Sequence, residues 1–253
     1  MGQAVTLSVT VLGTSGMFAT PERACAGYLL DWAGFRLWMD AGAGAWRNLV
    51  QHVPYPSVNG VLLTHRHSDH TTDVFQAVHA RQYGGPEPLE PIPLWAPQET
   101  LDRLQAFDSE IADSFVLTPV SAGDHLDVHD AGFDFVEMVH PPVTLGIRVT
   151  CDGGVLAYSA DTGPTADLGA LARAADVFVC EATLQDADEP WYGHMSASQA
   201  GAAAADLGVD RLLLTHLPPG RDPQVSLAQA TAACGSVRAT LAEDGQRLEL
   251  ADR

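Results

Sequence analysis

The sequence predicts an α/β protein in which two βα layers pack sheet against sheet, with helices on the outside. Strand-like and helix-like segments alternate in both halves of the 253-residue chain. Each half also contains one copy of the tetrapeptide Leu-Leu-Thr-His, at 62–65 and at 213–216, where an apolar strand-like run ends. We interpret the two copies as equivalent strand ends from two related halves. Because no linker separates the halves, we expect one domain over residues 1–253.

In the first half, short apolar runs are separated by glycine turns, a pattern typical of strands. Strands are expected at Val5–Leu12, Gly27–Asp31, Phe35–Asp40 and Val58–Thr64, followed by a helix over Thr71–Tyr83. The run at Val58–Thr64 is nearly all apolar, as in a strand covered on both faces. Four prolines between residues 86 and 93 then indicate a crossing over the surface.

The rest of the chain continues the alternation of strands and helices. Strands are expected at Phe133–Val139, Leu145–Thr150, Val155–Ser159, Val177–Cys180 and Arg211–Thr215. Helices are expected at Gln98–Phe107, Pro164–Ala175 and Ser196–Leu207, and from Asp222 to Cys234. The helix from Ser196 has the clearest boundaries, because Ser196 and Gln199 form a capping-box pattern and Gly208 is a helix stop.

Charge is the unusual feature of the composition. The chain has 32 acidic and 13 basic residues, a formal net charge of −19, and every basic residue is Arg. The absence of Lys excludes a Schiff-base lysine and a P-loop. Because long nucleic acids are normally bound by basic surfaces, we expect no long RNA or DNA as a partner. A small anionic substrate drawn to a metal in a cleft is compatible with this charge.

The cysteines and the beginning of the chain bear on its location. The cysteines are Cys25, Cys151, Cys180 and Cys234. Because they are scattered and form no C-x-x-C pair, we expect them to be reduced. Strand-like sequence begins at once, without the basic segment of a signal peptide, and no apolar run has transmembrane length. We therefore expect a cytoplasmic protein with no membrane partner.

Four potential metal ligands lie within six residues, in the stretch His65-Arg66-His67-Ser68-Asp69-His70. His65 and His67 are two residues apart as the chain leaves a strand, so both rings can point to one side. Asp69 and His70 continue toward a helix and direct their ligand atoms to a neighbouring point. One metal could take the first pair and a second metal the other, at the spacing of about 3.5–4 Å that is usual in hydrolytic centres.

Further ligands are expected at the ends of other strands. His140 follows the run Phe133–Val139, Asp161 follows Val155–Ser159, and His216 ends the second Leu-Leu-Thr-His. We expect these residues to converge with the six-residue cluster on one metal centre. The remaining histidines are expected to be ordinary surface or packing residues, namely His52, His79, His125 and His129.

With these motifs in this order, the chain resembles the metallo-β-lactamase superfamily, and within it the ribonuclease Z-like phosphodiesterase branch. Two further elements contribute to the resemblance, Cys180-Glu181-Ala182-Thr183 and Gly193-His194-Met195-Ser196. The resemblance implies a four-layer αββα sandwich with two divalent metal ions, zinc, manganese or iron. By this resemblance one metal is held by His65, His67 and His140, the other by Asp69, His70 and His216, and Asp161 bridges them.

The resemblance also implies a mechanism. A hydroxide shared by the two cations attacks the phosphorus, since a water on such a metal is acidified. Asp69 can orient or deprotonate that water, and His194, held by Glu181, protonates the leaving group. Asp40 is expected to hydrogen-bond a ligand histidine. Cys180 stands where the branch has a histidine, which leaves the proton relay open at this position.

The substrate is expected from the same resemblance. Enzymes of the branch that process tRNA carry a long arm between the third histidine and the bridging aspartate, but here His140 and Asp161 are 21 positions apart. We expect hydrolysis of a small cyclic phosphodiester, with a 3′,5′-cyclic nucleotide as the first choice. Alternatives are a thioester or lactone hydrolase, a ribonuclease Z-like RNA phosphodiesterase, and a non-enzymatic metal protein. Relatives are commonly dimers, so a homodimer is a possible assembly.

Overall fold

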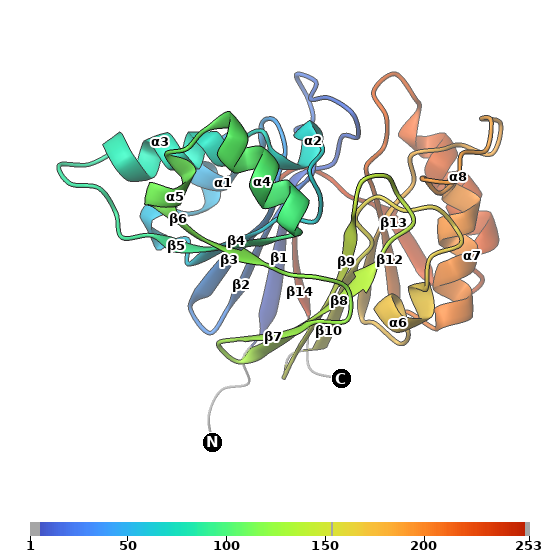
Figure 1. The fold of residues 1–253 in the computed structure, drawn as a ribbon. Helices are drawn as coiled ribbons and strands as arrows, with labels where there is room; N and C mark the ends of the chain where they lie inside the picture. The colour runs from blue at the N-terminus through green and yellow to red at the C-terminus, as the bar shows by residue number, and fades with distance from the viewer. Residues whose placement is uncertain (1–5, 153, 251–253) are drawn as a thin grey trace.

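The computed structural model of the protein describes residues 6–152 and 154–250. These residues form two seven-stranded sheets packed face to face, with helices on both outer faces (Figure 1). The expected four-layer α/β sandwich is therefore confirmed. Among the described residues, no helix combines the length and the apolar character that crossing a bilayer requires.

The first sheet contains the strands of the N-terminal half and the last strand of the chain. In spatial order they are β14 (Arg247–Leu250), β1 (Leu7–Gly13), β2 (Gly27–Trp32), β3 (Phe35–Ala41), β4 (Gly60–Leu62), β5 (Ile92–Ala96) and β6 (Phe115–Pro119). Neighbouring strands are antiparallel from β14 to β3 and parallel from β3 to β6. The sheet therefore changes from antiparallel to parallel pairing at β3.

The second sheet has the same plan. In spatial order its strands are β7 (His125–Val128), β8 (Ala131–Glu137), β9 (Leu145–Cys151), β10 (Gly154–Tyr158), β11 (Val177–Glu181), β12 (Arg211–Thr215) and β13 (Arg238–Leu241). Pairing is antiparallel from β7 to β10 and parallel from β10 to β13. The common plan supports the interpretation of two related halves.

The two Leu-Leu-Thr-His copies, however, do not end equivalent strands, and this part of the expectation is wrong. The first copy follows β4, the strand next to β3, whereas the second follows β12, which lies one strand further from the corresponding β10. The equivalent positions are the ends of β3 and β10, which lead into Asp40-Ala41-Gly42 and Asp161-Thr162-Gly163. A shared tetrapeptide was therefore a weaker guide to the repeat than the order of the strands.

The helices divide between the two outer faces. The first sheet is covered by α1 (Ala45–His52), α3 (Val74–Tyr83), α4 (Gln98–Phe107) and α5 (Ile111–Ser114), with the short η1 (Tyr55–Ser57) and α2 (Ser68–Thr71) in connecting segments. The second sheet is covered by α6 (Leu168–Ala172), α7 (Ala197–Leu207) and α8 (Pro223–Ala233). As expected, α7 begins with a capping box from Ser196 and Gln199 and ends at Gly208, which is left-handed.

Several expected elements differ in extent. The helix expected over Thr71–Tyr83 is mostly α3, which Thr72 and Asp73 separate from the short α2. The Asp73 carboxylate accepts hydrogen bonds from the backbone N–H groups of Gly44 and Trp46 at the start of α1. The helix expected over Pro164–Ala175 is only the five-residue α6. The surface crossing expected through residue 93 ends earlier, because Pro93 lies inside β5. For the strand expected from Val5, residue 5 lies outside the described residues.

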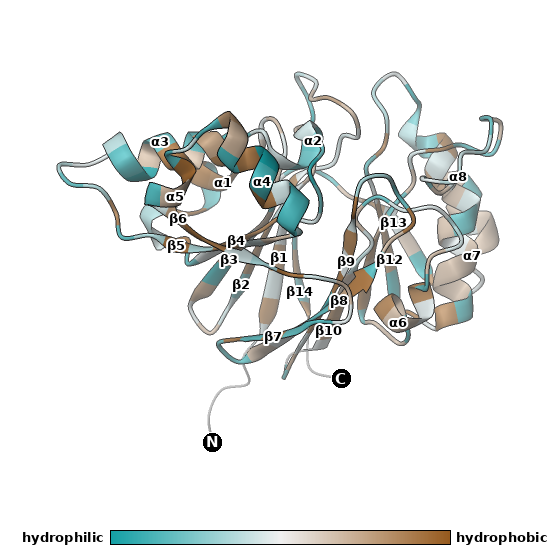
Figure 2. Cartoon of the chain, in the orientation of Figure 1, coloured by the Kyte–Doolittle hydropathy of each residue, from teal (hydrophilic) through white to brown (hydrophobic). Residues whose placement is uncertain are grey.

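The apolar residues of the strands form the central core between the sheets. Trp32 and Phe133 pack there from opposite sheets, and the rings of Tyr28 and Tyr158 lie 4.8 Å apart. Figure 2 shows hydrophobic colour on β8 and β9 and hydrophilic colour over much of α3 and α4. The core also reaches the functional edge of the sandwich, because the hydroxyl of Tyr158 donates to Asp40 at 2.9 Å.

Candidate metal centre and active site

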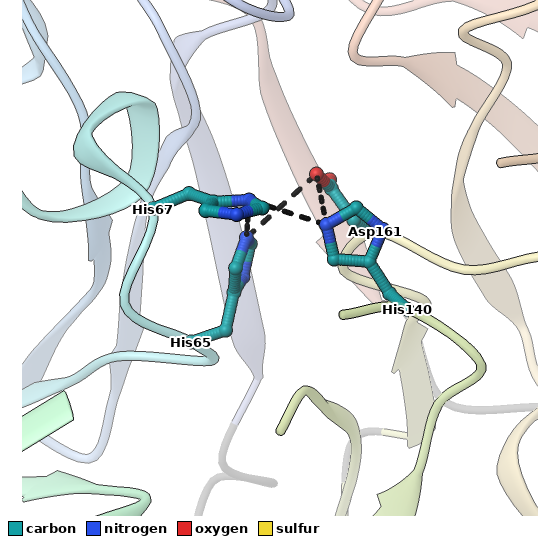
Figure 3. A group of neighbouring side chains, drawn as sticks. All are labelled: His65, His67, His140 and Asp161. Carbon is teal, nitrogen blue, oxygen red and sulfur yellow. Dashed lines mark hydrogen bonds and ion pairs between the residues drawn. The ribbon is translucent and has the colours of Figure 1, made fainter. Parts of the chain in front are cut away.

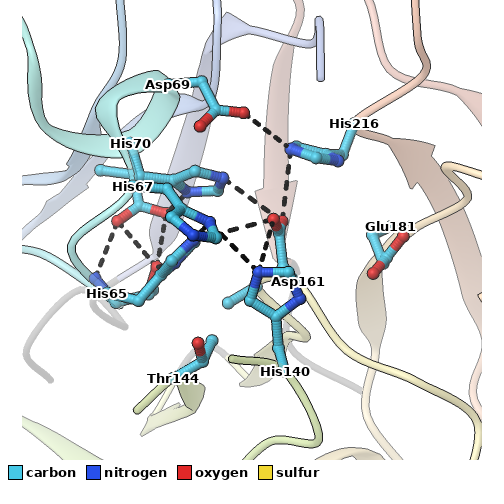
Figure 4. Close-up of polar contacts among 12 residues, drawn as sticks. His65, His67, Asp69, His70, His140, Thr144, Asp161, Glu181 and His216 are labelled. Carbon is cyan, nitrogen blue, oxygen red and sulfur yellow. Dashed lines mark hydrogen bonds and ion pairs between the residues drawn. The ribbon is translucent and has the colours of Figure 1, made fainter. Parts of the chain in front are cut away.

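The residues expected to form a metal centre lie at one edge of the sandwich, where strands of both sheets end (Figure 4). The segment after β4 carries His65 and His67 and continues into α2, which carries Asp69 and His70. His140, Asp161 and His216 lie in the segments that follow β8, β10 and β12. The structure therefore brings together side chains that are up to 151 positions apart in the sequence.

The first group of candidate ligands contains three histidines and one carboxylate (Figure 3). His67 Nδ1 lies 3.1 Å from His65 Nε2 and 3.2 Å from His140 Nε2. Asp161 Oδ2 lies 3.7 Å from the Nε2 atoms of both His65 and His140. One atom of each residue thus faces a common point, as metal binding requires.

The second group uses the other oxygen of the same carboxylate. Asp161 Oδ1 lies 3.3 Å from His70 Nε2 and 3.3 Å from His216 Nε2. Asp69 Oδ2 lies 3.3 Å from His216 Nε2. The two oxygens of Asp161 therefore face the two different groups of candidate ligands.

Two buried atoms of the second group test whether a cation fits. His70 Nε2 and Asp161 Oδ1 are fully buried, and neither has a well-oriented hydrogen-bond partner among the described residues. Such atoms are costly to bury unless something satisfies them. A divalent cation would satisfy both, and imidazole nitrogens with carboxylate oxygens suit zinc, manganese or iron. The donor set therefore fits a metal site.

Burial keeps the histidines of the first group neutral. It lowers the pKa of His65 well below the usual range, and it also lowers the pKa values of His67 and His140. Neighbouring imidazoles contribute in the same direction, whereas the carboxylate of Asp161 opposes them. Because neutral imidazole is the metal-binding form, these three rings are ready to act as ligands.

In the second group, charged neighbours outweigh the effect of burial on the pKa values. Burial lowers the pKa of His70, but Asp161 and Asp40 more than offset this effect and raise it well above the usual range. Burial raises the pKa of Asp161, but His216 and His70 outweigh it and hold the pKa well below the usual range. The carboxylate is therefore ionised, as a metal ligand must be.

Asp40 connects the second group to the core. Its Oδ2 atom is 2.7 Å from His70 Nδ1 and accepts a hydrogen bond from Tyr158, while Oδ1 accepts from the backbone N–H of Thr64 at 2.8 Å. The expected hydrogen bond from Asp40 to a candidate ligand histidine is therefore confirmed. It fixes the ring so that Nε2 of His70 faces Asp161.

Glu181 and His194 form the expected pair beside the two groups. Glu181 is fully buried at the end of β11, and its Oε1 atom is 2.7 Å from His194 Nδ1. Its other oxygen accepts hydrogen bonds from the backbone N–H and the hydroxyl of Thr183. The His194 ring centroid lies 4.9 Å from that of His140 and 5.7 Å from that of His216. His194 is thus held at the open side of the metal centre.

The substitution at Cys180 does not interrupt this pair. Successive residues of a strand point to opposite faces, so Cys180 and Glu181 diverge. The Cys180 thiol packs in the apolar layer beneath α7, with its sulfur 4.0 Å from the sulfur of Met195. The residue is fully buried and makes no contact that connects it to His194 among the described residues. Cys180 therefore takes no part in the contact between Glu181 and His194.

Several residues that contact the site had no role assigned to them from the sequence. Thr183 has its hydroxyl 2.9 Å from His216 Nδ1, and the backbone N–H of Met17 donates to Asp69 Oδ2 at 2.8 Å. A Cβ atom on Gly16 would lie 2.8 Å from the His216 ring, so a glycine is needed there. The Gly13-Thr14-Ser15-Gly16 turn could have indicated this close approach, but only the fold shows which ring it meets.

The geometry can now be compared with known proteins. Residues 10–217 match the family model described as the β-lactamase superfamily domain. The chain belongs to this superfamily. Protein Rv1339 of Mycobacterium tuberculosis (strain ATCC 25618 / H37Rv) is 35% identical over 262 aligned positions, which cover 96% of this chain and 93% of that protein.

Other members of the superfamily resemble the chain along its length. The crystal structure of the metallo-β-lactamase fold protein YhfI from Bacillus subtilis matches with a TM-score of 0.88 and 25% identity, covering 97% of this chain and 99% of the other. Ribonuclease Z of Thermobifida fusca (strain YX) is 29% identical over 307 aligned positions, covering 98% of this chain and 96% of the enzyme. The protein is therefore a metal-dependent hydrolase of the β-lactamase superfamily.

Proposed function

We propose that the protein hydrolyses a small cyclic phosphodiester, with a 3′,5′-cyclic nucleotide as the first choice, using two divalent cations. The observation that carries the proposal is the position of the Glu181–His194 pair beside two ligand groups that share Asp161. A phosphodiester has an alkoxide leaving group, which needs a proton, and an anionic phosphate, which needs cations. The site offers residues for both requirements.

Each residue has a distinct part in this mechanism. His65, His67 and His140 would hold one cation, Asp69, His70 and His216 the other, and Asp161 both. Cations held there would lower the pKa of a water molecule and neutralise charge on the phosphoryl oxygens. Asp69 is fixed by the Met17 N–H, so its carboxylate can orient the attacking water.

His194 and Glu181 serve the leaving group. Because Nδ1 of His194 is bonded to Glu181, its Nε2 atom is the ring nitrogen that can donate a proton to the departing oxygen. The buried carboxylate holds the ring in this orientation. A substrate with a poor leaving group depends on this pair most strongly.

Three observations favour a small substrate over tRNA. The alignment with ribonuclease Z spans 307 positions although this chain has 253 residues, so that relative carries insertions that this chain lacks. The 21 positions from His140 to Asp161 hold the β9–β10 hairpin and leave no room for an arm. The net charge of −19 also opposes binding of a long polyanion.

A turnover screen tests the proposal. Zinc-loaded and manganese-loaded protein is assayed with 3′,5′-cyclic nucleotides, linear dinucleotides, a tRNA precursor, thioesters and lactones, with Asp161→Ala protein as the control. We expect the highest kcat/KM with a cyclic nucleotide. Faster cleavage of a thioester or lactone would favour an acyl hydrolase, and failure to cleave even bis(p-nitrophenyl) phosphate would indicate a non-enzymatic metal protein.

A further inference from the structure

A cleft of about 580 Å³ opens beside His194. It lies between the segment after β11 and the loops that follow β1 and β12, and Figure 1 shows these two loops rising at the same edge of the molecule. Its walls include Met17, Thr183, Trp191 and Pro218. Because Met17 is bonded to Asp69 and Thr183 to His216, the cleft borders the candidate metal centre directly.

Trp191 forms an exposed aromatic wall of this cleft. Its side chain is 41% exposed, whereas Trp32, Trp38 and Trp95 are buried and Trp46 is half-buried. The indole is nevertheless held in place, since its centroid lies 4.9 Å from that of His194. An exposed but fixed indole beside a reaction centre is a surface on which a flat ring can stack.

Charge makes the two ends of the cleft different. The far end carries the carboxylates of Asp188 and Glu189, and Asp188 is paired with Arg221, which leaves Glu189 without a cationic partner among the described residues of the cleft. Because Arg221 offsets only one of the two carboxylates, this end keeps a net negative charge, which disfavours a phosphate and favours groups that donate N–H hydrogen bonds. The other end borders the candidate metal ligands, which favour an anion when loaded.

The loops that frame the cleft are tied together. The Asp188–Arg221 ion pair joins the segment after β11 to the loop after β12, and Gln185 Nε2 donates to the backbone oxygen of Asp222 at 2.9 Å. The wall that carries Trp191 is thus fixed relative to His216. A preformed cleft of this kind binds a rigid group with little loss of conformational entropy.

We propose that this cleft binds the nucleobase of the substrate, with Trp191 stacked on the face of the base and Glu189 accepting a hydrogen bond from its N–H groups. This inference rests on the proposed function and deepens it, because it makes Trp191 a specificity-determining residue. A substrate then lies with its base at the acidic end and its phosphate at the metal end. The uncompensated carboxylate of Glu189 disfavours a chain of phosphates at this end.

Tryptophan fluorescence tests the stacking without requiring turnover. Metal-loaded protein is titrated with adenosine 5′-monophosphate and, as a ligand without a base, with ribose 5-phosphate. We expect adenosine 5′-monophosphate to quench emission in the wild type but not in Trp191→Phe, and to bind about tenfold more tightly than ribose 5-phosphate. Equal affinities of the two ligands, or quenching that persists in Trp191→Phe, would overturn the inference.

Variants separate stacking from a structural role of the indole. Trp191→Ala should raise KM for cyclic adenosine monophosphate about tenfold with little change in kcat, and Trp191→Phe should restore most of the loss. Phe107→Ala, which alters an exposed ring of α4 outside this cleft, should change neither constant. A fall in kcat alone would show that Trp191 only positions His194 and would overturn the inference.

The two proposals fail in different ways. Binding of adenosine 5′-monophosphate through Trp191, with no hydrolysis of any cyclic nucleotide, would reject the proposed reaction and keep the nucleobase cleft. Hydrolysis of a cyclic nucleotide with an unchanged KM in Trp191→Ala would keep the reaction and reject the cleft.

Discussion

The two halves of the molecule contribute to the candidate metal centre in opposite ways. The first half supplies four candidate ligands from a single segment after β4, whereas the second supplies His140, Asp161 and His216 from three different strand ends. The candidate ligands of the first half therefore form a local sequence motif, whereas those of the second half come together only in the folded sheet. The Glu181–His194 pair also belongs to the second half, so the residues that we propose to serve the leaving group come from the half that supplies fewer candidate ligands.

The two Asp-x-Gly turns, which occupy equivalent positions in the two sheets, differ in how they contribute to the site. At the end of β3, Asp40 contacts the outer nitrogen of His70, whereas Asp161, which follows β10, lies among the candidate ligands themselves. The glycines of both turns allow a close approach: a Cβ on Gly42 would lie 2.0 Å from the backbone oxygen of Asp69, and one on Gly163 would lie 1.6 Å from that of Tyr192. The same turn thus supports the ligand segment in one half and the His194 segment in the other.

The largest effect is expected from Asp161. Replacing it with alanine should lower turnover about a thousandfold or more and reduce metal content at both positions, because both oxygens are lost. His67→Ala should reduce the content of only one position. Metal analysis with activity measurements distinguishes the two variants, and Asp206→Ala, an exposed carboxylate of α7, is the control. Near-normal activity of Asp161→Ala would contradict the bridging role.

A smaller and more selective effect is expected from His194. His194→Ala should slow a substrate with an alkoxide leaving group about a hundredfold or more, and hardly affect a p-nitrophenyl ester, whose leaving group needs no proton. Glu181→Gln should follow the same pattern, whereas Cys180→Ala, on the opposite face of β11, should leave both rates unchanged. Equal slowing of both substrates by His194→Ala would rule out proton donation.

A substitution of Asp40 should lower the affinity of the protein for metal. Asp40→Asn keeps the shape of the side chain but removes the charge that orients His70, so metal affinity should fall about 10- to 100-fold at one position. Competition with a chelator measures the loss. If the metal at the first group were lost instead, the assignment of Asp40 to the second group would be wrong.

Substitutions of Gly42 and Gly163 test whether the two Asp-x-Gly turns act independently. Alanine at Gly42 or Gly163 places a Cβ against backbone, so each variant should lose about 1–3 kcal/mol of folding free energy in denaturant titrations. Beyond this loss, Gly42→Ala should weaken metal binding, and Gly163→Ala should reproduce the leaving-group dependence of His194→Ala with metal retained. The same functional defect in both variants would contradict the division between the halves.

The sequence was most informative where the chemistry is local. The spacing of His65, His67, Asp69 and His70 predicted two neighbouring groups, and strand ends pointed to His140, Asp161 and His216. Short edge strands and irregular connections were missed, among them β6, β7, β13, β14 and α1. Their sequences lack a strong period of their own, and their state depends on pairing with strands far away in the chain.

The sequence by itself therefore determined the fold class, the main strands and helices, and the residue types of the site, because periodicity and capping act over a few residues. Only the tertiary structure decided that Asp161 turns one oxygen to each group, that Cys180 points away from His194, and that Trp191 faces a cleft at the metal centre. These facts depend on how two sheets pack and on which strands are neighbours, and such long-range contacts leave no periodic trace in the sequence.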